Sequence, residues 1–218
     1  QVPFYDADTP AITAFADLPI FVIGNGPSLD EAEAFIKKNY HKAIIFACGS
    51  ALGSLTSMGV KADFHILVER PYRNYQAVLD MASPEVYGEL NLLALNTVYP
   101  DTVDLYKWSG LALKGNEAAT DFVNIMLALQ KRKSFSSTPY SNPLVANTGL
   151  SFALNLGFKN VYLFGVDNGS YDTAHHSKHS IYDGKSKTKF RYFPNKVGEH
   201  TLPGNFGGEV SSNSVYSM

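Results

Sequence analysis

"LPIFVIGNGPSLDEAEAFI", residues 18–36, passes from an apolar strand to a helix through one short turn. Gly24 and Gly26 permit backbone angles that other residues avoid, and Pro27 suits the first turn of a helix. Ser28 or Asp30 can cap that helix. Because free N–H groups at a helix N-terminus attract anions, the turn predicts a phosphate site, although an ordinary tight turn explains it equally well. It is neither a G-x-G-x-x-G fingerprint nor a Walker loop, so it does not indicate NAD or a P-loop ATPase.

The same alternation of apolar runs and helical patterns continues along the 218 residues. The predicted strands are 20–24, 43–48, 64–69, 91–95 and 161–165, with weaker ones at 111–114 and 205–210. The predicted helices are 29–39, 50–58, 73–82, 118–131 and 146–157. Continuously apolar strands are typical of parallel sheets covered on both faces. We therefore expect an α/β fold with a Rossmann-like, doubly wound, mostly parallel sheet.

Ligands of such folds bind beyond the carboxyl ends of the strands. The segments expected there are polar or rich in glycine: Gly24–Ser28, Cys48–Ser50, Glu69–Arg73, Asn96–Thr97 and Gly165–Tyr171. Residues 132–147 form a long connection of the kind that often serves as a lid.

Composition excludes several classes of function. The net charge of −2 supplies no basic field for nucleic acid or an anionic membrane, so we expect neither as a partner. Cys48 is the only cysteine, which predicts a buried structural thiol in a reducing, cytoplasmic protein. No apolar stretch reaches the roughly 20 residues of a membrane span, and no signal peptide is visible. We expect an N-terminal extension at 1–17 and a single domain at 18–218, excised from a longer protein.

Residues 147–182 form the second informative stretch. Asn147, Thr148 and Gly149 can cap a helix, and a strand then delivers Asp167 and Asn168 at its carboxyl end. Three histidines and two tyrosines follow: His175, His176, His179, Tyr171 and Tyr182. The spacing of the histidines does not suit zinc, so a general base is favoured, with a solvated histidine-rich loop as the alternative.

These motifs resemble two related families. "IGNGPSL" and the segment from Thr148 to Asp167 resemble bacterial sialyltransferases of lipooligosaccharide synthesis. The order of Gly24–Leu29, Gly59–Glu69, Gly165–His176 and "GNFGGEV" (204–210) is closer to the central domain of the flagellar motility accessory factors, the Maf proteins. The resemblance spans roughly residues 18–212.

The resemblance implies a sialyltransferase-like fold, a variant of the GT-A class, that binds a CMP-activated nonulosonic acid of the pseudaminic, legionaminic or sialic type. The acceptor would be a hydroxyl, in the Maf group a Ser or Thr of flagellin. The transfer would be inverting, with no metal and no further cofactor.

The residues expected to carry this chemistry fall into three sets. The nucleotide-binding set is Gly24, Asn25, Gly26, Pro27, Ser28, Ser50, Asn96, Thr148, Gly149 and Asp167, with N–H groups of 26–28 on the phosphate. For Asp167 we favour a structural role that pins the first loop. The catalytic set is His176 or His179 as base, with Tyr171 near the phosphate. Glu69 and Arg70 form the sugar-binding set, with Arg70 or Arg73 on the sugar carboxylate, unless they are only a solvated strand end.

Two other functions stay open. The first is an ATP- and magnesium-dependent 6-hydroxymethylpterin pyrophosphokinase, with Asp63, Glu69 and Asp167 as metal ligands. The second is a non-catalytic module that binds a nucleotide sugar or flagellin. For the glycine turn, the sequence predicts that Gly26→Val abolishes nucleotide binding and leaves the fold largely intact.

Overall fold

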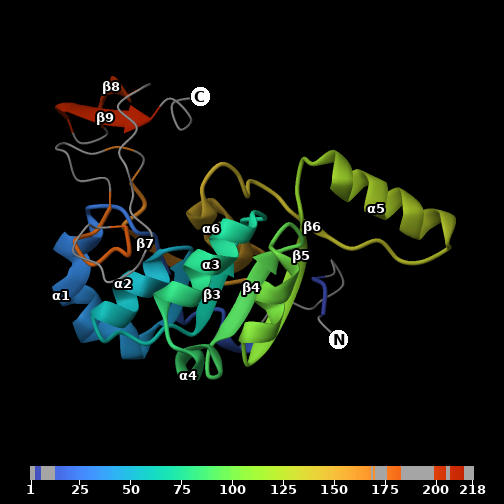
Figure 1. Cartoon of the computed structure of the whole chain (residues 1–218), viewed down its shortest axis with the longest axis horizontal. Coiled ribbons are helices and arrows are strands. Elements are labelled where there is room, and N and C mark those ends of the chain that lie inside the picture. The colour runs from blue at the N-terminus through green and yellow to red at the C-terminus, as the bar shows by residue number, and fades with distance from the viewer. Residues whose placement is uncertain are drawn as a thin grey trace.

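A computed structural model of the chain describes residues 3–5, 13–167, 169, 176–182, 199–204 and 207–213. Its centre is a seven-stranded sheet in the order β6-β5-β4-β3-β2-β1-β7 (Figure 1), in which all neighbouring strands are parallel. The strands are β1 (Pro19–Ile23), β2 (Ile44–Cys48), β3 (Phe64–Leu67), β4 (Asn91–Leu95), β5 (Trp108–Lys114), β6 (Ser137–Thr138) and β7 (Asn160–Phe164). The chain builds the sheet outward from β1 to β6 and then returns to place β7 on the other side of β1. The predicted doubly wound parallel sheet is confirmed, and its direction switches at β1.

Helices cover both faces of the sheet. The helices α1 (Leu29–Asn39), α2 (Ala51–Ser57), α3 (Tyr72–Met81) and α4 (Pro84–Tyr87) share one hydrophobic core, and α6 (Val145–Asn155) packs in a second core. In β1, Phe21 and Ile23 enter the first core, while Ile20 and Val22 enter the second. Burial on both faces is why the strand is apolar at every position. Short 3-10 turns lie at Thr13–Phe15, Tyr40–Lys42 and Pro100–Leu105 (η1, η2 and η3).

The weaker strand predictions need correction. β5 begins at Trp108, three residues before the predicted 111–114, because Ser109 and Gly110 interrupt its apolar run. The predicted strand at 205–210 is replaced by a separate antiparallel hairpin, β8 (Glu199–Pro203) and β9 (Glu209–Asn213). The connection 132–147 is not structureless, since its β6 residue Ser137 pairs with Leu113.

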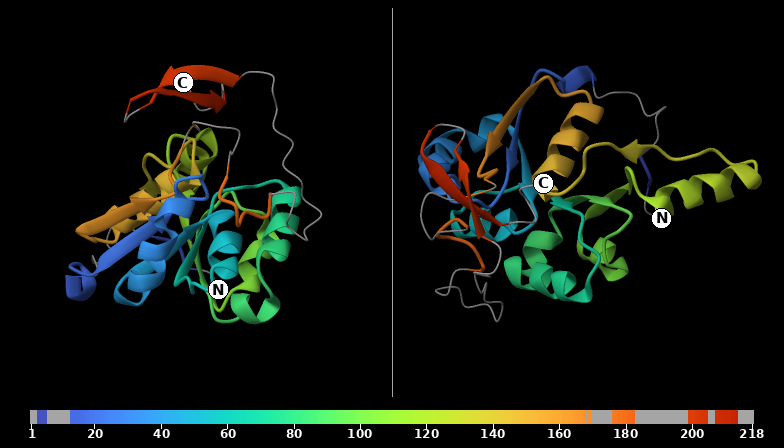
Figure 2. Two further views of the ribbon diagram at one scale, coloured as in Figure 1. Left: turned by 90° about the vertical axis from the view of Figure 1, so that its left-hand side faces the viewer. Right: turned by 90° about the horizontal axis from the view of Figure 1, so that it is seen from above.

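Two further features lie at the β5 side of the sheet. Within the predicted N-terminal extension, residues 3–5 lie along β5, where the Tyr5 N–H donates to the Leu111 carbonyl at 2.7 Å. The helix α5 (Ala118–Leu129) projects away from the sheet (Figure 1), as the right-hand view of Figure 2 also shows. None of the helices among the described residues is long and apolar enough to cross a membrane.

Candidate functional site

The glycine turn after β1 packs directly against the loop after β7, backbone against backbone. The Gly24 N–H donates to the Phe164 carbonyl and the Gly26 N–H donates to the Gly165 carbonyl, each at 2.8 Å. A Cβ atom at Gly24 would lie 2.4 Å from the Gly165 oxygen. Because no side chain fits between the two loops, their close packing is sufficient to explain why position 24 is a glycine.

Asp167 occupies the N-terminus of α1. Its Oδ2 accepts a hydrogen bond from the Ser28 N–H at 2.9 Å, and a Cβ at Gly26 would lie 2.2 Å from the same oxygen. The prediction that Asp167 pins the first loop is therefore confirmed. A carboxylate at this position also interacts favourably with the helix dipole.

This arrangement corrects three sequence predictions. The N–H groups of Gly26 and Ser28 already donate to protein acceptors, and Pro27 has no N–H, so the backbone of residues 26–28 offers no donor to a phosphate in the structure. The Ser28 side chain makes no capping hydrogen bond, because Asp167 supplies the cap from β7 instead. Gly26→Val would displace the Asp167 carboxylate, so it would disturb the fold as well as any ligand.

Asn25 is the centre of a buried hydrogen-bond network. Its Nδ2 donates to the hydroxyls of Ser50 at 2.9 Å and Ser180 at 2.8 Å, and its Oδ1 accepts from Ser54 at 2.6 Å. The Asn25 carbonyl also accepts the N–H of Ser177 at 3.0 Å. The expected role of this side chain in bridging a phosphate or ribose does not fit, because its amide is already committed to three serines.

We expect Asn25→Ala to lower the free energy of unfolding by about 2 kcal/mol, because three hydroxyl groups lose their partner and two of them, on Ser54 and Ser180, are buried. Urea unfolding measures this change. The control is Asn39→Ala, which removes one exposed side-chain bond to the Phe35 carbonyl and should cost less than 1 kcal/mol. Equal costs for the two variants would contradict the role of Asn25.

Residues 176–182 pass over α1 and α2 and are held by ionic contacts. The Ser177 hydroxyl donates to Asp30 at 2.5 Å, and His179 Nε2 lies 3.1 Å from Glu33. Hydrogen bonds from Lys37, Lys178 and His179 lower the pKa of Glu33 to about 2. His179 therefore faces the charged surface of α1, whereas the ring of His176 lies 5.2 Å from that of Tyr182.

A pocket of about 220 Å³ opens at the carboxyl ends of β2 and β3. It is lined by residues that follow these strands and by side chains from α3, η3, α6 and the 176–182 segment. They are Gly49, Ser50, Leu67, Val68, Glu69, Asn74, Tyr75, Ala77, Val78, Met81, Thr102, Val145 and Tyr182. Ser50 and Glu69 are the predicted site residues among them. His176 reaches the pocket indirectly, through its ring contact with Tyr182.

Ser50 and Tyr182, two of the side chains that line this pocket, carry hydroxyl groups. Ser50 Oγ accepts from Asn25, which leaves its own proton for another acceptor. The pKa of Tyr182 is raised, first by burial and then by the charge of Glu69, while Arg73 acts in the opposite direction. Tyr182 is therefore a protonated donor at neutral pH.

A buried histidine supports the floor of the pocket. His65 Nε2 lies 2.8 Å from the Gly49 carbonyl, and Nδ1 lies 2.7 Å from the Tyr106 hydroxyl. A carbonyl can only accept, so we assign the proton to Nε2, and Nδ1 then accepts from Tyr106. Burial lowers the pKa of His65 to about 4, so the ring is neutral at physiological pH. The contact holds Gly49 at a φ of +55° and thereby positions Ser50.

Several predicted site residues instead hold the scaffold together. Thr148 has no exposed surface and donates to the Ser141 carbonyl at 3.0 Å. A Cβ at Gly149 would lie 2.7 Å from Cys48 Sγ, so this glycine permits close helix–sheet packing. Because α6 begins at Val145, both residues lie within the helix and do not cap it. Both residues therefore have a structural role here, and their contact with a nucleotide stays a prediction.

Two other predicted residues have protein partners at the same edge. Asn96 Oδ1 accepts the Lys114 N–H at 3.0 Å, and Arg70 pairs with Glu117 at 3.2 Å. Neither lines the pocket. Cys48 is buried, and burial raises the pKa of its thiol, which confirms the structural assignment. Tyr171, Asn168 and His175 lie outside the described residues.

Sequence reasoning missed most of the lining. Asn74 and Tyr75 belong to "RPYRNYQ" (70–76), directly after the β3 loop, and this polar and aromatic run was the available signal. Thr102 in η3 gave no signal, because only the tertiary fold brings it to α3.

Together these features define a Rossmann-like α/β domain with a polar pocket at the carboxyl edge of its sheet. The chain belongs to the MptE-like family, described as 6-hydroxymethylpterin diphosphokinase MptE-like, whose model matches residues 6–173. The chain is also similar to the structure of a Maf glycosyltransferase from Magnetospirillum magneticum, which aligns with a TM-score of 0.73 and 29% identity, over 99% of this chain and 30% of that one. The chain thus spans under a third of that protein's length. A comparison with proteins of curated function found no match.

Proposed function

We propose that the domain transfers a nonulosonic acid from a CMP-activated donor to a hydroxyl acceptor, a Ser or Thr of a protein such as flagellin. The observation that supports this is the polar pocket beyond β2 and β3, in a chain similar to a Maf glycosyltransferase. Neither the sugar nor the acceptor is named by that similarity, so both belong to the proposal. We place the reaction in the cytoplasm.

In the proposed reaction the acceptor oxygen attacks the anomeric carbon, and the bond to the CMP oxygen breaks with its electron pair leaving on CMP. The enzyme must then stabilise the anionic leaving group and accept the hydroxyl proton. Ser50, Asn74 and Tyr182 would donate to the phosphate or sugar. Glu69 would bind sugar hydroxyls, and His176 would be the base. Of the two arginines predicted for the sugar carboxylate, Arg73 would bind it, because Arg70 pairs with Glu117. We propose no metal or further cofactor.

The second candidate function is the diphosphokinase, because the MptE-like family is described by that activity. The magnesium ligands predicted for it do not converge. Asp63 precedes β3 and accepts the Ile45 N–H at 2.8 Å, whereas Glu69 follows β3 at the opposite edge and Asp167 is bound to Ser28. Among the described residues no group of three His, Cys, Asp or Glu side chains could hold a metal ion. We therefore retain this function as an outcome of the test below.

We expect CMP or CTP in EDTA to raise the melting temperature by roughly 5–10 °C. Ligand at a hundred times its dissociation constant adds about 2.7 kcal/mol, and each kcal/mol shifts a chain of this size by about 2–4 °C. UMP, ATP and GTP, each with magnesium or EDTA, complete the series, and transfer from a CMP-sugar to a peptide then tests the reaction.

Ser50→Ala should weaken CMP binding by about tenfold, since a hydrogen bond to a charged group is lost. Ser57→Ala is the control, because that hydroxyl bonds only its own helix at the Gly53 carbonyl. Stabilisation by ATP with magnesium alone would replace the proposal with the diphosphokinase. Binding of CMP without any transfer would favour a recognition module.

A further inference from the structure

Three tyrosines form an aromatic cluster beside the pocket. Tyr72 and Tyr75 lie in the first two turns of α3, and Tyr99 comes from the connection between β4 and η3. The centroids of Tyr72 and Tyr99, and of Tyr75 and Tyr99, are each 5.2 Å apart, and those of Tyr72 and Tyr75 are 6.0 Å apart. We refer to Tyr72, Tyr75 and Tyr99 as the tyrosine platform. Tyr75 lines the pocket, which connects the platform to it.

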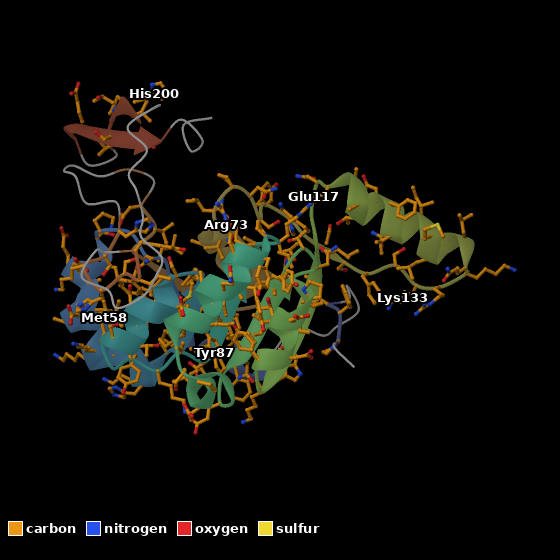
Figure 3. All side chains as sticks on the ribbon, in the orientation of Figure 1. Met58, Arg73, Tyr87, Glu117, Lys133 and His200 are labelled. Carbon is orange, nitrogen blue, oxygen red and sulfur yellow. The ribbon has the colours of Figure 1, made fainter. Side chains whose placement is uncertain are left out.

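The platform leaves aromatic surface in solvent at this edge. Tyr72 is 54% exposed, and the other two rings are only partly buried. Arg73 follows Tyr72 in the sequence and precedes Asn74, which lines the pocket, and its side chain is exposed. Figure 3 shows Arg73 at the edge where the strands end, opposite Tyr87. An exposed aromatic surface offers a stacking face to a planar ring such as a nucleotide base.

The volume of the pocket limits how much of a ligand can lie inside it and how much must lie on its rim. Pockets that enclose a small ligand usually measure about 300–1,000 Å³. At about 220 Å³ this one is too small for a whole nucleotide sugar, so part of such a ligand must lie on the rim. The platform is an aromatic part of that rim and continues directly from Tyr75.

We infer that the tyrosine platform stacks the base of the nucleotide, with the sugar end in the pocket. The inference rests on the proposed function, because it takes a nucleotide sugar as the occupant. Stacking on an aromatic ring accepts any base, so the platform would contribute affinity, while selectivity for cytosine would come from other contacts.

The test compares nucleotides with a ligand that lacks the base. Calorimetry would measure binding of CMP, UMP and ribose 5-phosphate to wild type, Tyr72→Ala, Tyr99→Ala and the matching Phe variants. We expect both alanine variants to weaken CMP and UMP by about 5- to 100-fold and to leave ribose 5-phosphate unchanged. The Phe variants should bind as wild type does. Tyr162→Ala is the control. That ring is 48% exposed and lies on the edge strand β7, which β1 and β2 separate from β3, the strand that leads into α3.

The outcomes separate the two proposals. Equal CMP affinity in wild type and both alanine variants would overturn the platform and leave the transferase proposal to its own transfer assay. Equal loss for CMP and ribose 5-phosphate would also overturn it, because the tyrosines would then act on the pocket and not on the base. If wild type bound no nucleotide at all, both proposals would fall together. Circular dichroism and melting temperature confirm that each variant is folded.

Discussion

Gly165→Ala is expected to lower the free energy of unfolding by about 2–5 kcal/mol. Gly165 has a φ of +60°, where an L side chain costs about 1–2 kcal/mol. The added Cβ would also lie 2.5 Å from the Gly24 oxygen and 2.9 Å from Leu29 Cβ. Because the first neighbour is backbone, the turn after β1 must shift, and overpacking of this kind costs a further 1–3 kcal/mol.

Gly59→Ala is a matched control for the backbone cost. Gly59 has a φ of +72°, and a Cβ there would meet nothing within 4 Å. This variant should therefore lose only about 1–2 kcal/mol. Urea unfolding of the two variants measures the difference, which reports the contact between the two loops. Similar losses for both would show that the loops do not meet as described.

The second large effect concerns acid and the buried His65. Its pKa is lowered to about 4 in the folded state, whereas an unfolded histidine titrates near 6.5. Between these values the unfolded chain binds a proton that the folded chain does not, so stability rises with pH across this window and is constant above it. Acidification from pH 7.5 to 4 should remove on the order of 3 kcal/mol through this residue.

His65→Gln isolates this contribution. The variant keeps an acceptor and a donor but cannot titrate, so it should be less stable at pH 7.5 and show a flatter profile between pH 6.5 and 4.5. Glu33 contributes at lower pH, because its folded pKa is about 2 and its stabilisation is lost as the pH falls from about 4.5 toward that value. Denaturant unfolding at half-unit steps of pH gives both profiles. If the stability of wild type and of His65→Gln changed in parallel with pH, His65 would not be the source of the pH dependence.

The structure divides the predicted site residues into two groups. Ser50 and Glu69, after β2 and β3, line the pocket, whereas Asn25, Thr148 and Asp167 bond to other parts of the protein. The glycine turn, in contrast, was interpreted as open to a phosphate because nothing near it in the sequence competes for its N–H groups. The competitor is Asp167, which lies 139 residues from Ser28 in the chain.

The sequence alone determined the architecture, because a helix or strand follows from apolar periodicity within 5–12 residues and β1, α1, β4 and α5 each carry that pattern locally. Only the tertiary structure decided which polar groups face a ligand. Ser50, Tyr75, Thr102 and Tyr182 come from separate segments, and packing of the sheet and its helices brings them together. The same packing turns Asn25, Thr148 and Asp167 toward protein partners. A polar residue in a loop can bond either way, and which one it does depends on neighbours that lie far from it along the chain.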